Sequence, residues 1–188
     1  EVVIPTPFWV TYSELVKIAK GKVVTVRSTA EAGFKISPEQ LEAAITPRTK
    51  LFLFSSPCNP SGAVYSESEL KALAAVFLKH PQIMILSDEI YEYINFVGKH
   101  FSLAAIPELK ARVVVINGLS KGFAMTGWRI GYIAADATIA KACEKVQGQF
   151  TSGTNSIAQK AAVAALTADL RPTLDMVQEF SNRRTRVL

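Results

Sequence analysis

Residues 51–88 read LFLFSSPCNPSGAVYSESELKALAAVFLKHPQIMILSD, and this stretch predicts a strand, a helix and a second strand. Its first five residues and the run Ile83–Ser87 are short, almost wholly apolar and rich in branched side chains. Such runs are typical of parallel strands that are buried on both faces. Between them, apolar residues recur at helical spacing over residues 67–79, and Ser66 with Glu69 has the pattern of a capping box. The stretch therefore predicts an α/β fold with a mostly parallel, helix-covered sheet.

The flanking sequence extends this pattern. Further strands are expected at 2–4, 23–26, 113–116 and 130–134, with helices at 13–20, from Pro38 to before Pro47, from Asp136 to about 150, at 156–167 and from Pro172 onward. The first helix is expected to end at Gly21, because glycine readily takes the left-handed conformation of a C-cap. The connection between 113–116 and 130–134 is short for a parallel crossover, so the last strand should run antiparallel.

Polar side chains follow the predicted strands at their carboxyl ends. Asn59 lies in the turn after the strand at 51–55, and Asp88 and Tyr91 follow the next one. A third apolar run, at 113–116, leads into Lys121. In open α/β sheets the carboxyl ends of the parallel strands form the edge where ligands bind. We therefore expect these four side chains to converge.

Lys121 carries the strongest chemical signal. A lysine amine is a useful nucleophile only where its position is fixed and its pKa is lowered, and a short, glycine-punctuated turn at a strand end is one place where this can happen. Residues 117–123 read NGLSKGF, and Arg129 follows eight positions after the lysine. A lone Ser-Lys pair is more often a surface loop. Here the expected convergence of Lys121 with Asn59, Asp88 and Tyr91 at one edge of the sheet favours a functional site instead.

Three motifs carry a family resemblance: Ser56–Gly62, Ser87–Tyr91 and Ser120–Tyr132. In this order and at these spacings, they resemble the central part of the class I/II aminotransferases, in the aspartate aminotransferase family of fold-type I pyridoxal-phosphate enzymes. The resemblance runs over residues 1–188. It implies the α/β large domain of such an enzyme, with pyridoxal 5′-phosphate as the cofactor and no metal.

The resemblance also implies roles for individual residues. Lys121 resembles the lysine that bonds to the cofactor aldehyde and later moves the substrate proton. Asp88 resembles the carboxylate that holds a proton on the pyridine nitrogen and so deepens the electron sink. These two are the expected catalytic residues, and both also bind the cofactor.

Other matching positions are expected to hold the cofactor or the substrate. Tyr91 and Asn59 resemble the pair that hydrogen-bonds the phenolic oxygen, and Arg129 resembles the arginine that pairs with the phosphate. Trp9 resembles the aromatic residue stacked on the pyridine ring. Trp9 and Asn59 are also expected to contact the substrate. Ser120 is a further candidate for a phosphate hydrogen bond.

Each assignment has a plainer alternative. Asp88 could cap a helix that begins near residue 89, Tyr91 and Trp9 could be core aromatics, and Arg129 could belong to a surface ion pair. Cys58 has no histidine nearby in sequence and is better explained as a small turn residue than as a nucleophile.

The two histidines, His80 and His100, are isolated in the sequence. They are given no catalytic or metal-binding role.

The chain departs from the family pattern in three ways. Gly118 stands where many members have a hydroxyl residue that contacts the phosphate, and Ser61 stands where threonine is common. The third departure is that no match is found for the upstream glycine-containing turn that cups the phosphate, or for the downstream arginine that binds the substrate carboxylate. Residues 1–188 are therefore expected to be an incomplete large domain, without its upstream segment and its C-terminal small domain. Alone, it is expected to be inactive.

The implied reaction is ping-pong transfer of an amino group from an L-amino acid to a 2-oxo acid. Aspartate with 2-oxoglutarate is the first expectation, and prephenate or aromatic oxo acids are alternative acceptors. Another fold-type I activity, such as a carbon–sulfur lyase, and a ligand-sensing domain of a transcription regulator remain open. A homodimer is expected.

The Asn59–Pro60 bond is expected to be cis, because the Asn59 side chain must point at the cofactor from a tight turn.

The composition is typical of a single globular domain and not of a membrane or nucleic-acid-binding protein. The chain has 188 residues, of which 49% are hydrophobic and 20% charged, enough to bury one core. The net charge of +5 is modest, and the basic cluster at 183–186 is more typical of a solvated helix face than of a nucleic-acid groove. No apolar stretch has the length of a membrane span and no signal peptide is visible at Glu1, so no membrane or nucleic-acid partner is expected. Cys58 and Cys143 lie far apart, which favours a reducing cytoplasm over a disulfide.

Overall fold

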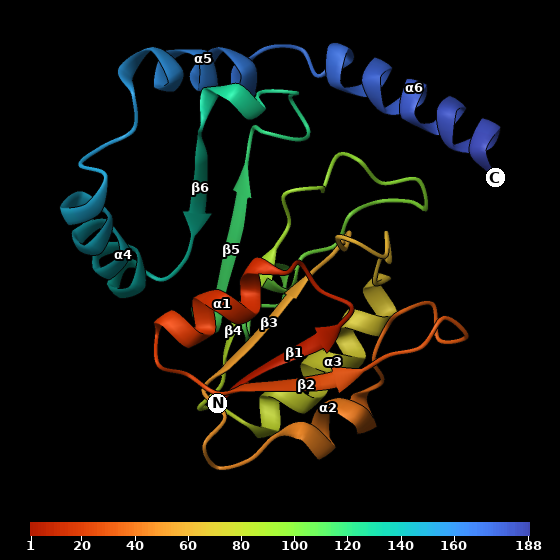
Figure 1. Ribbon diagram of the computed structural model, residues 1–188, viewed down its shortest axis with the longest axis vertical. Helices are drawn as coiled ribbons and strands as arrows, with labels where there is room; N and C mark the ends of the chain where they lie inside the picture. Colours follow the sequence, from red (N-terminus) through yellow and green to blue (C-terminus); the bar gives the residue numbers. More distant parts are fainter.

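A six-stranded sheet organises the chain in a computed structural model that describes residues 1–188 (Figure 1). The strand order is β2-β1-β3-β4-β5-β6. The strands are β1 (Val2–Thr6), β2 (Val23–Arg27), β3 (Leu51–Ser55), β4 (Met84–Asp88), β5 (Val113–Gly118) and β6 (Gly131–Ala134). All neighbouring pairs are parallel except β5 with β6. The expected α/β class, the mostly parallel sheet and the antiparallel last strand are confirmed.

Six α-helices connect and extend the sheet. They are α1 (Thr11–Ile18), α2 (Pro38–Ala44), α3 (Glu67–Lys79), α4 (Ala137–Phe150), α5 (Ser156–Thr167) and α6 (Arg171–Val187), with short 3₁₀ turns at Leu103–Ala105, Lys110–Arg112 and Thr126–Trp128. The start of α3 has the predicted capping box of Ser66 and Glu69. The helix predicted from Pro38 is α2, and the structure adds a capping box of Ser37 and Gln40 at its start.

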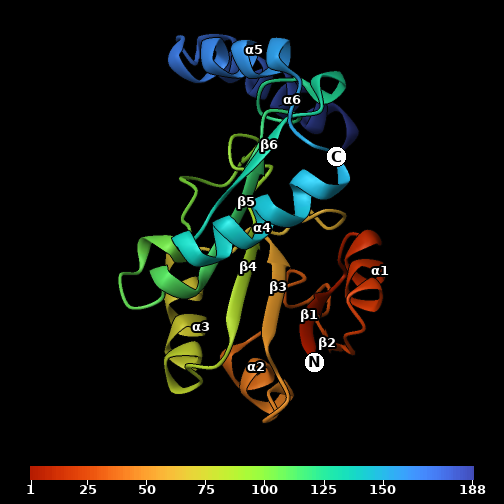
Figure 2. The ribbon, with the colours of Figure 1, turned by 90° about the vertical axis from the view of Figure 1, so that its left-hand side faces the viewer.

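The two faces of the sheet bury separate clusters because side chains alternate along each strand. Val3 and Phe52 face a cluster of 17 buried residues that includes the inner sides of α2 and α3. Ile4 and Leu53, one position on, face a cluster of four buried residues completed by α1. Figure 2 shows α1 and α3 on opposite sides of the sheet. Fully burying one such large apolar side chain contributes about 1.5–3 kcal/mol.

The end of α1 differs from expectation. The left-handed residue is Lys20 (φ 56°) rather than Gly21. The Gly21 amide donates to the Val16 carbonyl (2.8 Å) and the Lys20 amide donates to the Lys17 carbonyl (2.8 Å), which is the Schellman pattern. A Cβ built on Gly21 would lie 2.9 Å from Val16 Cγ1, so this glycine is required by close packing and not by a left-handed backbone.

The last three helices extend away from the sheet. α5 and α6 form an arm at the top of Figures 1 and 2, beyond the β5–β6 pair. α4 has no buried residue, and all four residues of β6 are exposed. None of the helices in the chain combines the length and the apolar character needed to cross a membrane.

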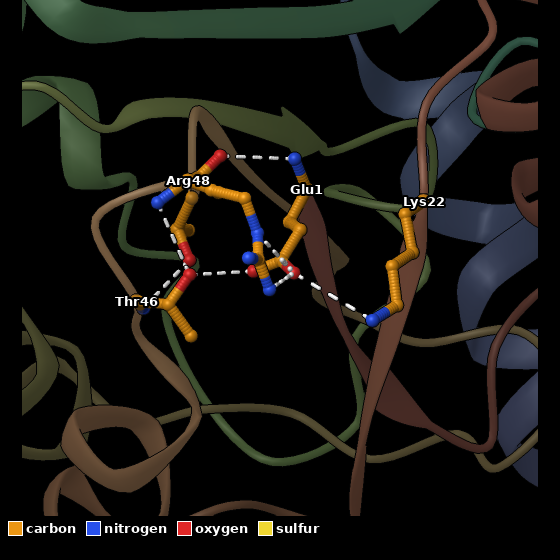
Figure 3. A network of polar contacts seen from close by, with 5 residues as sticks. Glu1, Lys22, Thr46 and Arg48 are labelled. Carbon is orange, nitrogen blue, oxygen red and sulfur yellow. Dashed lines mark hydrogen bonds and ion pairs between the residues drawn. The ribbon is translucent and has the colours of Figure 1, made fainter.

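A polar cluster joins the start of β1 to its neighbours (Figure 3). The Glu1 carboxylate accepts hydrogen bonds from Thr46 Oγ1 (2.6 Å) and from Arg48 Nε and Nη2 (3.1 and 2.9 Å), and Lys22 Nζ lies 3.7 Å away. The Glu1 side chain is only 4% exposed. The hydrogen bonds from Thr46 and Arg48 lower the pKa of Glu1 to about 2. The cluster lies at the amino end of β1, opposite the end where the strands deliver their polar residues.

Candidate functional site

Asp88 is the last residue of β4 and lies at the carboxyl edge of the sheet. In the strand register it pairs with Ser55 of β3 and Ile116 of β5. Its Oδ1 accepts a hydrogen bond from the Ile90 amide (3.2 Å), which closes a turn. No helix begins at residue 89, so the helix-cap alternative is wrong.

Tyr12 is the direct partner of this carboxylate. Its hydroxyl donates to Asp88 Oδ2 at 2.6 Å, and the tyrosine is only 4% exposed. Burial, reinforced by the negative charge of Asp88, raises the pKa of Tyr12 above its ordinary value, so the hydroxyl keeps its proton for this hydrogen bond. Ser55, the register neighbour of Asp88, has a buried hydroxyl without a hydrogen-bond partner. Neither Tyr12 nor Ser55 was anticipated from sequence.

Lys121 and Tyr91 approach one another although they lie on different loops. Lys121 Nζ is 5.8 Å from the centre of the Tyr91 ring. Both residues are partly buried, so Tyr91 is not a core aromatic. Tyr91 in turn lines a cavity of about 460 Å³ together with Asn59 and the rest of the turn at 57–62. The expected approach of the β3, β4 and β5 loops is therefore present at this edge.

The turn that carries Asn59 has the expected geometry. The Asn59–Pro60 bond is cis, as predicted, and the Ser56–Pro57 bond is also cis. Cys58 is a free, partly buried residue in this turn, in keeping with the small-residue interpretation.

Arg129 and Ser120 are linked through one intermediate residue. Arg129 Nη1 donates to the Thr126 carbonyl (2.9 Å), and Thr126 Oγ1 donates to the Ser120 carbonyl (2.9 Å). Arg129 is exposed, has a left-handed backbone (φ 53°) and forms no ion pair, so the surface ion-pair alternative is wrong. Its guanidinium is free to bind an anion. It lines a second cavity of about 770 Å³ with residues of the 151–155 segment.

Trp9 lies beside Tyr12 at the entrance to α1. Its ring meets the Tyr12 ring edge-on, with centroids 5.7 Å apart and an interplanar angle of 89°. Trp9 is 44% exposed, so it is not a core aromatic. An exposed indole next to the partner of Asp88 is available to cover a flat ring bound above the carboxylate.

The glycine at position 118 has a structural explanation. Gly118 pairs with Gly131 across β5 and β6, and a Cβ built on it would lie 2.9 Å from Gly131 Cα and 3.0 Å from the Ile130 carbonyl. A hydroxyl side chain cannot be added there unless the strands move apart. Position 118 therefore has no side chain that could donate a hydrogen bond from this loop.

A buried polar cluster around Glu89 is not marked by a local sequence pattern, because two of its contacts join positions 11 and 13 residues apart. Glu89 is 3% exposed and accepts hydrogen bonds from Ser87 Oγ (2.8 Å) and Ser102 Oγ (2.7 Å), while its other oxygen lies 2.8 Å from His100 Nε2. Burial raises the pKa of the nearby Glu92 above its ordinary value. His100 is therefore not isolated in space. The three groups Glu89, Glu92 and His100 have potential ligand atoms within 4.8 Å of one another. Because both Glu89 oxygens are already hydrogen-bonded within the chain, we interpret the cluster as a structural one that holds the loop after β4 in place, and not as a metal site.

Residues 1–188 match the family model described as aminotransferase class I and II. The chain is 54% identical over 185 residues to the aspartate/prephenate aminotransferase of Nitrosomonas europaea, a match that covers 97% of this chain and 47% of that protein. It is 51% identical to the aspartate aminotransferase of Geobacillus stearothermophilus, with the same coverage of 97% and 47%. A solved structure of the aspartate aminotransferase from Rhizobium meliloti gives a TM-score of 0.95 at 45% identity, covering 99% of this chain and 47% of that chain. The chain thus spans about half the length of these relatives.

Proposed function

The chain belongs to the class I and II aminotransferase family, and we propose that it forms the cofactor-binding floor of a pyridoxal-phosphate site for amino-group transfer. The observation that supports this most directly is the convergence at one sheet edge of a carboxylate, Asp88, with the Lys121–Tyr91 pair. We also propose that residues 1–188 are the large domain of a longer protein, as the half-length coverage of the relatives supports.

The residues present have the donor chemistry that pyridoxal phosphate requires. The Asp88 carboxylate would accept a hydrogen bond from the protonated pyridine nitrogen, and the neighbouring buried Ser55 hydroxyl is an additional polar atom without a partner. Asn59 and Tyr91 offer an amide and a hydroxyl to the phenolic oxygen. The Arg129 guanidinium has no ion-pair partner, and its N–H groups other than the one bonded to the Thr126 carbonyl would be available to the phosphate. The Ser120 hydroxyl is a second candidate.

When bound, the cofactor supplies an electron sink for the charge that develops at the substrate α-carbon. Tyr12 fixes Asp88 Oδ2 by its short hydrogen bond, so the carboxylate stays oriented while it holds the pyridine proton. Lys121 Nζ would hold the cofactor aldehyde in the resting protein. The same nitrogen would be placed to move a proton at the substrate α-carbon. Trp9 would cover the ring and exclude water from one face.

Aspartate and 2-oxoglutarate are the proposed substrate pair. Relatives named aspartate aminotransferase support the amino donor. Prephenate is a second proposed acceptor, because the relative from Nitrosomonas europaea is named for both compounds. We further propose a homodimer in a reducing cytoplasm, and the free state of Cys58 and Cys143 supports the second part.

The test is a transamination assay of the whole protein against a panel of amino donors, with Lys121→Ala beside it. The wild type should show visible cofactor absorbance that sodium borohydride fixes irreversibly. Lys121→Ala should lose the borohydride-fixed adduct and nearly all turnover, because no other residue can supply the amine at that position.

The matched control is Lys141→Ala, which removes an exposed lysine on α4. It should retain both the adduct and turnover. Normal turnover in Lys121→Ala would overturn the assignment of the lysine. Absence of the adduct in the wild type would overturn the proposal that the protein binds pyridoxal phosphate.

A further inference from the structure

We propose that Tyr93 is a positioning residue that holds the lysine-bearing loop at a fixed distance from the turn carrying Asp88 and Tyr91. The proposal rests on the proposed function, since it concerns how Lys121 is presented to the cofactor. The relevant contact joins two loops that follow different strands, β4 and β5.

The contact itself is tight. Gly122 is buried, and a Cβ built on it would lie 2.7 Å from Tyr93 Cδ2 and 3.3 Å from both Tyr93 Cβ and Tyr93 Cγ. The Tyr93 ring also meets the Phe123 ring edge-on, at a centroid distance of 5.4 Å and an angle of 74°. The ring therefore lies directly on the backbone of the lysine loop, and only a glycine at position 122 permits this approach.

The contact between Tyr93 and Gly122 lies close in sequence to both Lys121 and Tyr91. Gly122 directly follows Lys121, and Tyr93 is two residues beyond Tyr91. The segment at 89–94 is itself closed by two backbone hydrogen bonds: the Glu92 amide donates to the Glu89 carbonyl (2.9 Å) and the Ile94 amide donates to the Tyr91 carbonyl (2.8 Å). A shift of the ring would thus change the separation of Lys121 Nζ from the Tyr91 ring, now 5.8 Å.

A second contact ties the same turn to the sheet. A Cβ built on Gly118 would lie 3.3 Å from Ile90 Cδ1, so Ile90 packs on the end of β5. Ile90 and Tyr93 thus anchor the turn at two points, one on the strand and one on the loop that follows it. Tyr93 is the one that touches the loop of Lys121.

The contacts of Tyr93 given above are made by its ring and Cβ and do not involve its hydroxyl. The positioning effect is therefore assigned to the volume of the ring. Misplacing a reacting group by about 1 Å costs on the order of 100-fold in rate, so a loose lysine loop should have a measurable chemical effect.

The experiment is a double-mutant cycle in the whole protein with Tyr93→Ala, Gly122→Ala and the double variant. Tyr93→Phe and Phe34→Ala, which truncates a 39% exposed aromatic residue in a distant loop, are controls. Three quantities are measured: the rate at which the apoprotein forms a borohydride-reducible adduct with pyridoxal phosphate, kcat against KM, and the apoprotein Tm.

Both Tyr93→Ala and Gly122→Ala should slow adduct formation and lower kcat about 10- to 100-fold with little change in KM. In the double variant, Gly122→Ala should add almost nothing, because the atom 2.7 Å from its Cβ has been removed. Tyr93→Phe and Phe34→Ala should behave as wild type. Non-additive effects of the two substitutions on the rate of adduct formation indicate a positioning role. A general loss of stability would instead lower Tm without this coupling between the two positions.

Two results would count against the inference. Adduct rates in Tyr93→Ala equal to wild type, or additive losses in the double variant, would overturn it while leaving the proposed function intact. A wild-type protein that forms no adduct at all would overturn the proposed function, and the positioning role with it.

Discussion

At the scale of single residues, Asp88 gives a sharp test of the proposed chemistry. Asp88→Ala should leave the sheet folded, because the hydrogen bonds that the side chain loses, to the Tyr12 hydroxyl and the Ile90 amide, lie at the edge of the sheet. Turnover should fall by several orders of magnitude, since the pyridine nitrogen loses the carboxylate that holds its proton. Asp88→Glu should keep more activity than Asp88→Ala. Steady-state kinetics of the whole protein measure both.

Tyr12→Phe is the matched control for this pair. It removes one hydrogen bond to a charged group, worth about 1.5–3 kcal/mol, and keeps the ring in the α1 cluster. Its loss of turnover should therefore be clearly smaller than that of Asp88→Ala. Wild-type activity in Asp88→Ala would show that the carboxylate only closes its turn.

The residues of the site differ in how visible they are in the sequence. Asp88 and Lys121 could be predicted because apolar runs mark the strand ends that deliver them to one edge. Tyr12 could not, because its contact with Asp88 joins positions 76 residues apart and no local pattern records it. His100 appeared isolated for the same reason, although it is hydrogen-bonded to Glu89 in space.

At the scale of secondary-structure elements, helix starts were predictable and one helix end was not. These signals are local: the capping box of Ser66 and Glu69 predicts the start of α3, and Pro38 at a first helical position predicts the start of α2. The end of α1 depends on how Gly21 packs against Val16, which a sequence pattern does not report. Gly21 marks the end of the helix in the sequence, but the left-handed residue is Lys20, one position earlier.

This geometry predicts opposite effects at two adjacent positions. Lys20→Gly should stabilise the chain by up to about 1 kcal/mol, because it relieves a left-handed non-glycine residue. Gly21→Ala should destabilise it by about 1–3 kcal/mol, because the new Cβ meets Val16 at 2.9 Å. Urea midpoints measure both changes.

Gly148→Ala serves as the control for these glycine changes. Gly148 lies inside α4 and a Cβ there meets nothing within 4 Å, so alanine should stabilise the helix by up to about 1 kcal/mol. A stable Gly21→Ala variant would contradict the packing at the end of α1.

The Glu1 cluster predicts a pH dependence of stability. The pKa of Glu1 is lowered from 4.5 to about 2 in the folded chain, so the unfolded chain binds a proton more readily. The stabilisation is fully present above about pH 4.5 and is lost as the pH falls toward 2. Glu1→Gln should flatten the stability profile in this window, measured by urea unfolding at each pH.

Glu67→Gln is the control for the acid effect. Its pair with Lys71 joins side chains that are 57% and 60% exposed, so its loss should change stability little at any pH. Equal profiles for Glu1→Gln and wild type would show that the cluster in Figure 3 does not stabilise the fold.

At the scale of the whole molecule, residues 1–188 alone should bind pyridoxal phosphate weakly and show no measurable transamination. Arg129, all of β6 and Trp9 are exposed, so the site is open to water. Charged contacts are weaker in water than in a closed site, and a loosely held substrate loses the positioning that raises the rate. Equilibrium dialysis and an aspartate assay test this, with the whole protein as the control. Tight binding with normal turnover would contradict it.

The strand order also determines when the sheet can be assembled during synthesis. β1 is an interior strand, flanked by β2 on one side and by β3 on the other, with Val2 opposite both Val23 and Leu51. A ribosome adding about 5–20 residues per second makes β3 roughly 2–10 s after β1. Until β3 is made, the edge of β1 that later pairs with β3 stays unpaired. The early sheet is therefore a surface on which a chaperone, or a neighbouring nascent chain, can act before the site exists.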